Sequence, residues 1–147
     1  MSEMHGKSMP SRGWGLTFGA WLVATISTLG ALFLGEVMGY TPCALCWYQR
    51  IAMFPLVFVL AAGLIPFDPR VVRYALPLAV IGWGLAVFHQ MLVAGWIPES
   101  VKPCQQGAPC SDVQVVWLDF VSIPLLSVTA FSIVVGLLLA TLFKSSR

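Results

Sequence analysis

Four long apolar stretches, separated by short polar connections, dominate the hydrophobic pattern of this chain. They cover residues 16–38, 47–65, 74–97 and 123–143. A bilayer core about 30 Å thick is crossed by about 20 helical residues, so each stretch is long enough to span a membrane. The second stretch is the shortest, because its continuous apolar part begins only at about Arg50. It reaches spanning length if the helix begins earlier, inside the polar motif that precedes Arg50. The pattern predicts an all-α membrane protein, a four-transmembrane-helix bundle.

Composition agrees with this pattern. Hydrophobic residues make up 59% of the 147 positions and charged residues 10%, against roughly 25% charged in an average soluble domain. The connections are too short for a separate soluble domain, so we expect residues 1–147 to form a single integral membrane domain. The first stretch is longer than a typical signal-peptide core and no small-residue cleavage site follows it, which predicts that it is retained.

The basic residues are unevenly distributed along the chain. Six of the eight lie in the amino terminus, the middle connection and the carboxyl terminus: Lys7, Arg12, Arg70, Arg73, Lys144 and Arg147. Because basic residues accumulate on the cytoplasmic side of a membrane, both termini are predicted to be cytoplasmic and the other two connections extracytoplasmic. In the second of these, the apolar spacing of Val113, Val116, Trp117 and Phe120 predicts a short interfacial helix.

All four cysteines fall in the two connections predicted to be extracytoplasmic. Cys43 and Cys46 are three residues apart, and Cys104 and Cys110 are six apart. That side of the membrane is oxidising and permits disulfides. Cys46 is expected to lie at the start of a helix, where free amides and the helix dipole favour a thiolate, so it is the preferred reactive sulfur. A zinc site or plain stabilising disulfides are the alternatives that spacing leaves open.

Two polar residues lie within reach of the first cysteine pair. Arg50 is one helical turn after Cys46, where it either snorkels to the interface or stabilises the thiolate or an anionic cofactor group. His89 is about eight residues from the outer end of the third stretch, in the same leaflet. It is either a hydrogen-bonded packing residue or a ligand for a cofactor carbonyl that can also shuttle a proton. Gln90 is a weaker candidate for the same role.

Repeated oxidation of thiols requires an electron acceptor. Gly13, Gly15 and Gly19 lack the spacing of a dinucleotide motif, and two histidines, of which His5 lies in the terminal tail, do not make a haem site. A quinone fits, because it is lipid-soluble and accepts two electrons and two protons within the membrane.

The octapeptide from Cys43 to Arg50, Cys-Ala-Leu-Cys-Trp-Tyr-Gln-Arg, combined with four spanning stretches and a second external cysteine pair, resembles the DsbB family of disulfide bond formation proteins. The segment from Lys102 to Ser111 is most similar to the compact BdbC-type branch of that family. The resemblance implies a bacterial inner or plasma membrane thiol oxidase that reoxidises an extracytoplasmic, thioredoxin-like (DsbA-like) thiol oxidase. Electrons would pass through both cysteine pairs to ubiquinone or menaquinone. The implied partners are that protein and membrane lipid, with no nucleic acid.

Carried over by position, the resemblance implies that Cys104 forms the mixed disulfide with the partner and that Cys110 resolves it or exchanges with Cys43. It places Cys46 beside the quinone, with Arg50 and His89 nearby. The short spacing of the second pair departs from better-studied members of the family, so the surface helix is expected to supply any movement between the pairs.

Two other classes remain open at this point. A quinone-linked reductase of the vitamin K epoxide type shares four helices and a CxxC motif, but that motif usually comes late in the chain. A non-enzymatic membrane protein with structural disulfides or a bound zinc would leave Arg50 and His89 without roles.

Overall fold

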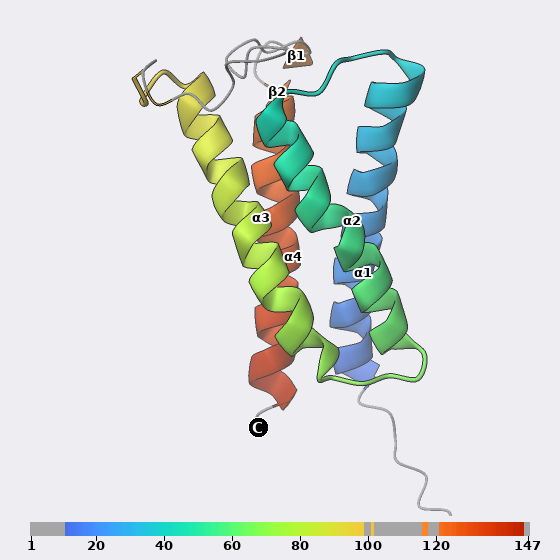
Figure 1. The fold of residues 1–147 in the computed structure, drawn as a ribbon. Helices are drawn as coiled ribbons and strands as arrows, with labels where there is room; N and C mark the ends of the chain where they lie inside the picture. Colours follow the sequence, from blue (N-terminus) through green and yellow to red (C-terminus); the bar gives the residue numbers. More distant parts are fainter. Residues whose placement is uncertain (1–10, 99–100, 102–115, 118–120, 146–147) are drawn as a thin grey trace, which may run out of the picture.

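The computed structural model describes residues 11–98, 101, 116–117 and 121–145, and its four long helices form a bundle (Figure 1). In chain order the elements are helix α1 (Ser11–Leu32), π-helix η1 (Phe33–Val37), helices α2 (Ala44–Leu64) and α3 (Val71–Val93), strands β1 (Val116–Trp117) and β2 (Val121–Ser122), and helix α4 (Ile123–Ser145). The predicted all-α fold is confirmed.

Neighbouring helices in the sequence run in opposite directions. Helix α1 packs against α2 and α4, and α3 packs against the same two helices. The connection before α2, the end of α3 and the start of α4 therefore lie at one end of the bundle, whereas the α2–α3 connection lies at the other (Figure 1). We call the first of these the motif end, because the octapeptide of residues 43–50 starts there.

The two connections at the motif end set where α2 begins and α3 ends. Helix α1 continues through η1, and Gly39, at φ +72°, then turns the chain toward α2. Cys43 has extended backbone angles and is the N-cap of α2, so this helix does begin inside the cysteine motif. Helix α3 ends at Val93 rather than 97, because Gly95 adopts φ +76°, a left-handed conformation that glycine tolerates.

The predicted interfacial helix falls mostly outside the described residues. At Val116 and Trp117, which are described, the helix prediction is wrong: they form β1, which pairs antiparallel with β2, Val116 opposite Ser122 and Trp117 opposite Val121. β-Branched and aromatic side chains favour such pairing. The spacing of apolar residues alone did not indicate that strand β2 follows β1 closely enough to pair with it.

The bundle is apolar outside as well as inside. Its core contains small side chains on α1 and α3 and larger ones on α2 and α4, such as Leu56, Leu60 and Phe131. Large side chains are exposed on the outer surface, among them Phe58 at 75% and Ile51 at 62%. Among the residues that the structure describes, four helices are long and apolar enough to cross a bilayer. The chain is therefore a multi-pass membrane protein, in which lipid covers this outer surface.

Candidate active site

Cys43 and Cys46 form a reduced pair at the amino-terminal end of α2. Both are free thiols, and their Sγ atoms lie 3.3 Å apart and share a hydrogen bond. Cys43 is the buried N-cap residue, whereas Cys46, in the first helical turn, is only partly buried. Because a disulfide needs about 2.05 Å between sulfurs, a small side-chain movement is enough to close the ring.

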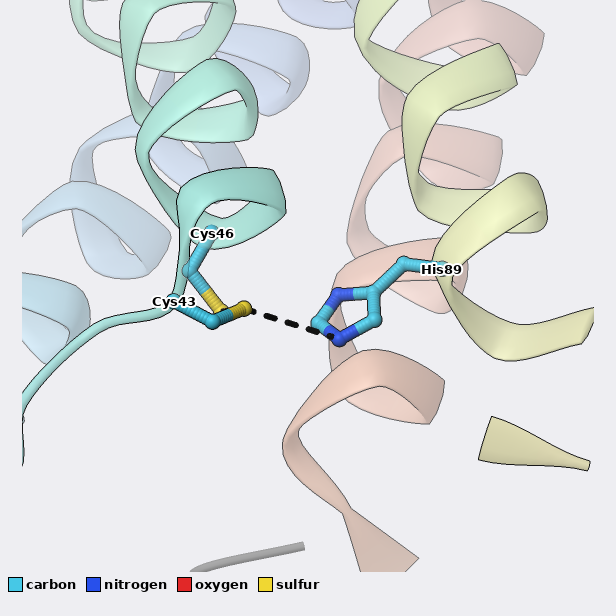
Figure 2. Close-up of side chains that lie close together, drawn as sticks. All are labelled: Cys43, Cys46 and His89. Carbon is cyan, nitrogen blue, oxygen red and sulfur yellow. Dashed lines mark hydrogen bonds between the residues drawn. The ribbon is translucent and has the colours of Figure 1, made fainter. Parts of the chain in front are cut away.

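His89 reaches this pair from helix α3, as Figure 2 shows. Its Nε2 atom lies 3.8 Å from Cys43 Sγ, and the side chain is 3% exposed. The opposite ring nitrogen, Nδ1, lies 3.0 Å from the Nε2 amide nitrogen of Gln49. An amide nitrogen only donates, so Nδ1 accepts and the imidazole proton sits on Nε2, directed at the Cys43 sulfur. This places a proton donor beside the dithiol.

Gln49 is itself held by the fourth helix. The Ser127 hydroxyl on α4 donates a hydrogen bond to Gln49 Oε1, and the Gln49 side chain is 6% exposed. A hydrogen-bonded chain thus runs from Ser127 through Gln49 and His89 to Cys43, and it links α4, α2 and α3. We call these four residues the polar chain. Each buried polar group in it has a partner, as groups removed from water require.

The surroundings of Cys43 favour its ionised form. A hydrogen bond from the Cys46 thiol, opposed by burial and assisted by His89, holds the pKa of Cys43 well below its usual range. The negative charge of the reduced pair is therefore favoured on Cys43. The position of Cys46 at the start of a helix predicted the thiolate on Cys46 instead, and which sulfur reacts with an acceptor stays a prediction.

Arg50 lies one turn below Cys46 on α2 and is directed toward the end of α1. Its Nη2 donates to the Ala31 carbonyl at 2.8 Å, and its guanidinium carbon is 5.5 Å from the centre of the Trp47 ring. Gly35 makes room for it, because a Cβ atom there would lie 3.1 Å from Nη2. The guanidinium is therefore held by a hydrogen bond to a backbone carbonyl and by contact with an aromatic face. The absence of a side chain at Gly35 leaves room for it.

The dithiol and several polar residues around it line one apolar cavity among the helices. Its volume is about 480 Å³, which is typical of small-molecule sites. Its walls come from all four helices and from the Tyr40–Pro42 connection. The polar groups of the dithiol region that line it are Cys43, Cys46, Gln49, Arg50, His89 and Ser127. The arrangement offers a reactive dithiol and several hydrogen-bond donors to a largely apolar ligand.

The structure brings together four of the six predicted site residues: Cys43, Cys46, Arg50 and His89. The other two, Cys104 and Cys110, lie outside the described residues. Gln90, the weaker candidate, does not line the cavity.

Sequence reasoning missed Gln49 and Ser127. Gln49 follows Cys46 by three residues, a helical spacing that could have revealed it. Nothing in the sequence near Ser127 indicates that α4 faces α2 at this level.

A partly buried dithiol at the start of one spanning helix, beside a histidine and an apolar cavity, is the kind of site expected in a membrane-embedded thiol–disulfide oxidoreductase. Comparison with known proteins identifies the kind. The family described as "Disulfide bond formation protein DsbB" matches residues 14–141, and the chain belongs to this family. The match favours this class over a vitamin K epoxide-type reductase and over a protein with structural disulfides alone.

Individual relatives agree with the family match. A "Probable disulfide formation protein" from Metapseudomonas resinovorans is 50% identical over 127 residues, which is 86% of this chain and 88% of the relative. "Disulfide bond formation protein C" from Bacillus subtilis (strain 168) is 40% identical over 120 residues, 80% of this chain and 86% of the relative. A "Probable disulfide formation protein" from Deinococcus radiodurans is 39% identical over 128 residues, 81% and 83% of the two chains. No solved structure matches the chain significantly. The predicted resemblance to the BdbC-type branch is confirmed.

Proposed function

We propose that this protein is a membrane thiol oxidase that reoxidises an extracytoplasmic, thioredoxin-like disulfide donor and passes the electrons to a quinone. The observation that carries the proposal is the opening of the Cys43–Cys46 dithiol, with His89 and Arg50, onto an apolar cavity within the membrane-spanning bundle. A soluble electron acceptor would not need such a position. Membership of the DsbB family supports the same assignment.

The proposed orientation places the motif end outside the cytoplasm. Arg12, Arg70, Arg73 and Lys144 all belong to the opposite end of the bundle, at the start of α1, around the α2–α3 connection and at the end of α4. Positive charge marks the cytoplasmic face. Both termini are therefore cytoplasmic in this proposal, and the cysteine pairs meet their partner on the oxidising side of the membrane.

The cavity suits a quinone headgroup. A quinone ring is flat and apolar on its faces, and its two carbonyl oxygens accept hydrogen bonds. The lining is mostly apolar, and Arg50 supplies N–H donors to it, whereas His89 lines the cavity with its one N–H directed at Cys43. When bound, the quinone supplies the two-electron acceptor. Ubiquinone and menaquinone both have this chemistry.

The electrons and protons balance along the proposed route. A partner dithiol loses two electrons and two protons as its own disulfide forms, and the Cys104–Cys110 disulfide is reduced. The second pair then reduces the Cys43–Cys46 disulfide by thiol–disulfide exchange, in which one S–S bond forms as another breaks. Cys104 takes the mixed disulfide with the partner in this scheme, and Cys110 resolves it or attacks at Cys43.

The residues around the first pair handle charge and protons in the last step. Both cysteines line the cavity, and Cys46 is the more exposed of the two, so we assign it to electron transfer to the acceptor. The His89 Nε2 proton, directed at Cys43, stabilises negative charge on that sulfur. Arg50, fixed at Ala31, places a permanent positive charge where the acceptor gains electron density. As the Cys43–Cys46 disulfide forms, the pair gives up two electrons and its remaining thiol proton, and the second proton that a quinol needs comes from the solvent that took it up when Cys43 ionised.

The test is turnover with purified components. The protein in detergent is mixed with a reduced thioredoxin-like partner and with either ubiquinone or menaquinone, and quinone absorbance is followed. We expect quinone reduction that Cys46→Ser abolishes. Unchanged turnover in Cys46→Ser, or no reduction of either quinone by the wild-type protein, contradicts the proposal.

A further inference from the structure

The reduced dithiol and His89 have the composition and spacing of a metal site. The ligand atoms of Cys43, Cys46 and His89 all lie within 4.8 Å of one another. Zinc–sulfur bonds of about 2.3 Å and zinc–nitrogen bonds of about 2.0 Å at tetrahedral angles separate two sulfurs by about 3.8 Å and a sulfur from a nitrogen by about 3.6 Å. The observed 3.3 Å between sulfurs and 3.8 Å from Cys43 Sγ to Nε2 differ from these values by about 0.5 Å or less.

The ligand set favours a thiophilic cation. Two thiolates and one imidazole are the ligands that Zn²⁺ selects, and together they cancel its charge. Among the residues the structure describes, no fourth cysteine, histidine or carboxylate joins this cluster. The fourth position of a tetrahedral ion is therefore left to water or to a small ligand in the adjoining cavity, as in sites with three protein ligands.

Gln49 and Ser127 can support the imidazole in the form that a metal needs. A metal on Nε2 requires the proton on Nδ1, so Gln49 must accept there rather than donate. Turning the Gln49 amide by half a rotation places Oε1 against Nδ1–H and the amide nitrogen against Ser127. The Ser127 hydroxyl then accepts instead of donating, which a hydroxyl can do. The same residues thus orient His89 in both forms, as the partners of metal-binding histidines generally do.

We propose that the reduced Cys43–Cys46 pair and His89 bind a thiophilic divalent cation such as Zn²⁺. The site exists only in the reduced protein, because formation of the disulfide removes both thiolate ligands. Binding itself does not depend on the function proposed above. Its consequence does: an ion held there occupies both sulfurs, so it traps the dithiol and inhibits electron transfer to the acceptor.

Cobalt provides a direct test, because Co²⁺ can occupy zinc sites and its visible absorption spectrum depends on its ligands and geometry. The experiment uses the full chain in detergent, with Cys104→Ser and Cys110→Ser to remove the other thiols, reduced and kept free of oxygen. We expect one Co²⁺ per chain, with thiolate-to-cobalt charge-transfer absorption and intense visible bands of tetrahedral cobalt, and displacement of both by Zn²⁺. The oxidised protein should show neither. A reduced protein without these bands overturns the proposal.

Substitutions assign the third ligand. We expect His89→Gln to weaken Co²⁺ binding at least tenfold and to shift the visible bands, whereas His5→Gln, in the amino-terminal tail, changes neither. Unchanged affinity and spectrum in His89→Gln would overturn the site as described. If circular dichroism shows that His89→Gln fails to fold, Gln49→Leu carries the test, with an expected loss of about 10- to 100-fold in affinity and with unchanged affinity as the contrary result.

The two proposals fail separately. If the protein binds cobalt through His89 but reduces no quinone, the metal site is supported and the proposed function is contradicted. If it reduces quinone but binds no cobalt, the proposed function is supported and the metal site is contradicted. If both hold, Zn²⁺ added to the reduced protein slows quinone reduction, and a chelator restores it.

Discussion

Gln49 on α2 and His89 on α3 meet with 3.0 Å between the amide nitrogen and Nδ1, and in this orientation of the amide the imidazole proton lies on the side of Cys43. Without this contact either ring nitrogen could carry the proton. The relationship makes Gln49 a positioning residue, since it acts on the dithiol only through His89.

Gln49→Leu is therefore expected to slow quinone reduction by about tenfold, which corresponds to about 1.4 kcal/mol in the barrier. It removes the partner of Nδ1 and leaves Ser127 without its acceptor. The pH profile of turnover should also change, because the imidazole loses its fixed tautomer. Gln90→Leu is the matched control. Within the described part of the chain the buried Gln90 Oε1 atom has no hydrogen-bond partner and the residue does not line the cavity, so turnover should be retained. Equal loss in both variants would show that α3–α2 packing, rather than the tautomer, is affected.

Arg50→Ala should raise the KM for quinone more than the KM for the protein partner. The guanidinium lies in the cavity wall and is fixed to the Ala31 carbonyl, so its loss affects the ligand in that cavity first. Steady-state kinetics with each substrate varied in turn measure the two constants. A larger rise for the protein partner would assign Arg50 to packing or to partner binding.

Gly35→Ala tests the position of the same guanidinium without removing its charge. The new Cβ would lie 3.1 Å from Nη2 and 3.2 Å from Nη1 of Arg50, so the side chain must shift. We expect a smaller rise in the KM for quinone than in Arg50→Ala, in the same direction. Gly84→Ala controls for a methyl group in a helix and should leave the KM unchanged, because no atom of the described residues lies within 4 Å of the added Cβ. No effect of Gly35→Ala would mean that the exact place of the charge is unimportant.

The lowered pKa of Cys43 predicts alkylation that persists in acid. A group with a depressed pKa stays ionised above that pKa, so the reduced pair should still react with iodoacetamide at about pH 6, where an ordinary thiol with a pKa of about 8.5 is almost fully protonated. Cys46→Ala removes the main hydrogen-bond donor, so the pKa of Cys43 should rise and its alkylation at that pH should fall. Mass spectrometry of the modified peptide measures both rates. Equal rates in the two proteins would refute the coupling between the sulfurs.

Gly82→Ala should destabilise the bundle. Its Cβ would overlap the ring of Phe131 and lie 3.0 Å from Cβ of Ala52, so α3 must move away from α4 and α2. Overpacking of this kind costs about 1–3 kcal/mol. Thermal unfolding in detergent should show a lower midpoint than for Gly84→Ala, and an unchanged midpoint would mean that the phenylalanine ring moves aside freely.

The sequence predicted the elements better than their contacts. Apolar length located all four helices, because a chain in lipid must satisfy its backbone hydrogen bonds within each helix. The early start of α2 followed from the same length argument. The end of α3 was placed at 97 because Trp96 and Ile97 continue the apolar run, and hydrophobicity does not register the left-handed turn at Gly95.

Some residues of the candidate site could be predicted from the sequence and others could not. Cys43, Cys46 and Arg50 were found because they share one motif and one helix turn, and His89 because a polar residue within a spanning helix is rare. Gln49 and Ser127 join the site through the rotation of α2 and α4 about their axes. That rotation is set by packing among four apolar surfaces, and no single segment contains it.

The polar chain has a second consequence, for how the bundle assembles. A helix that is apolar on every side has nearly the same hydrophobic free energy against lipid as against another helix. Hydrophobicity therefore distinguishes poorly between one rotation of the helix about its axis and another. Hydrogen bonds from Ser127 to Gln49 and from Gln49 to His89 are satisfied in one rotation of three helices. The residues that orient the imidazole therefore also select the native alignment of α2, α3 and α4, so that correct assembly and a competent dithiol arise together.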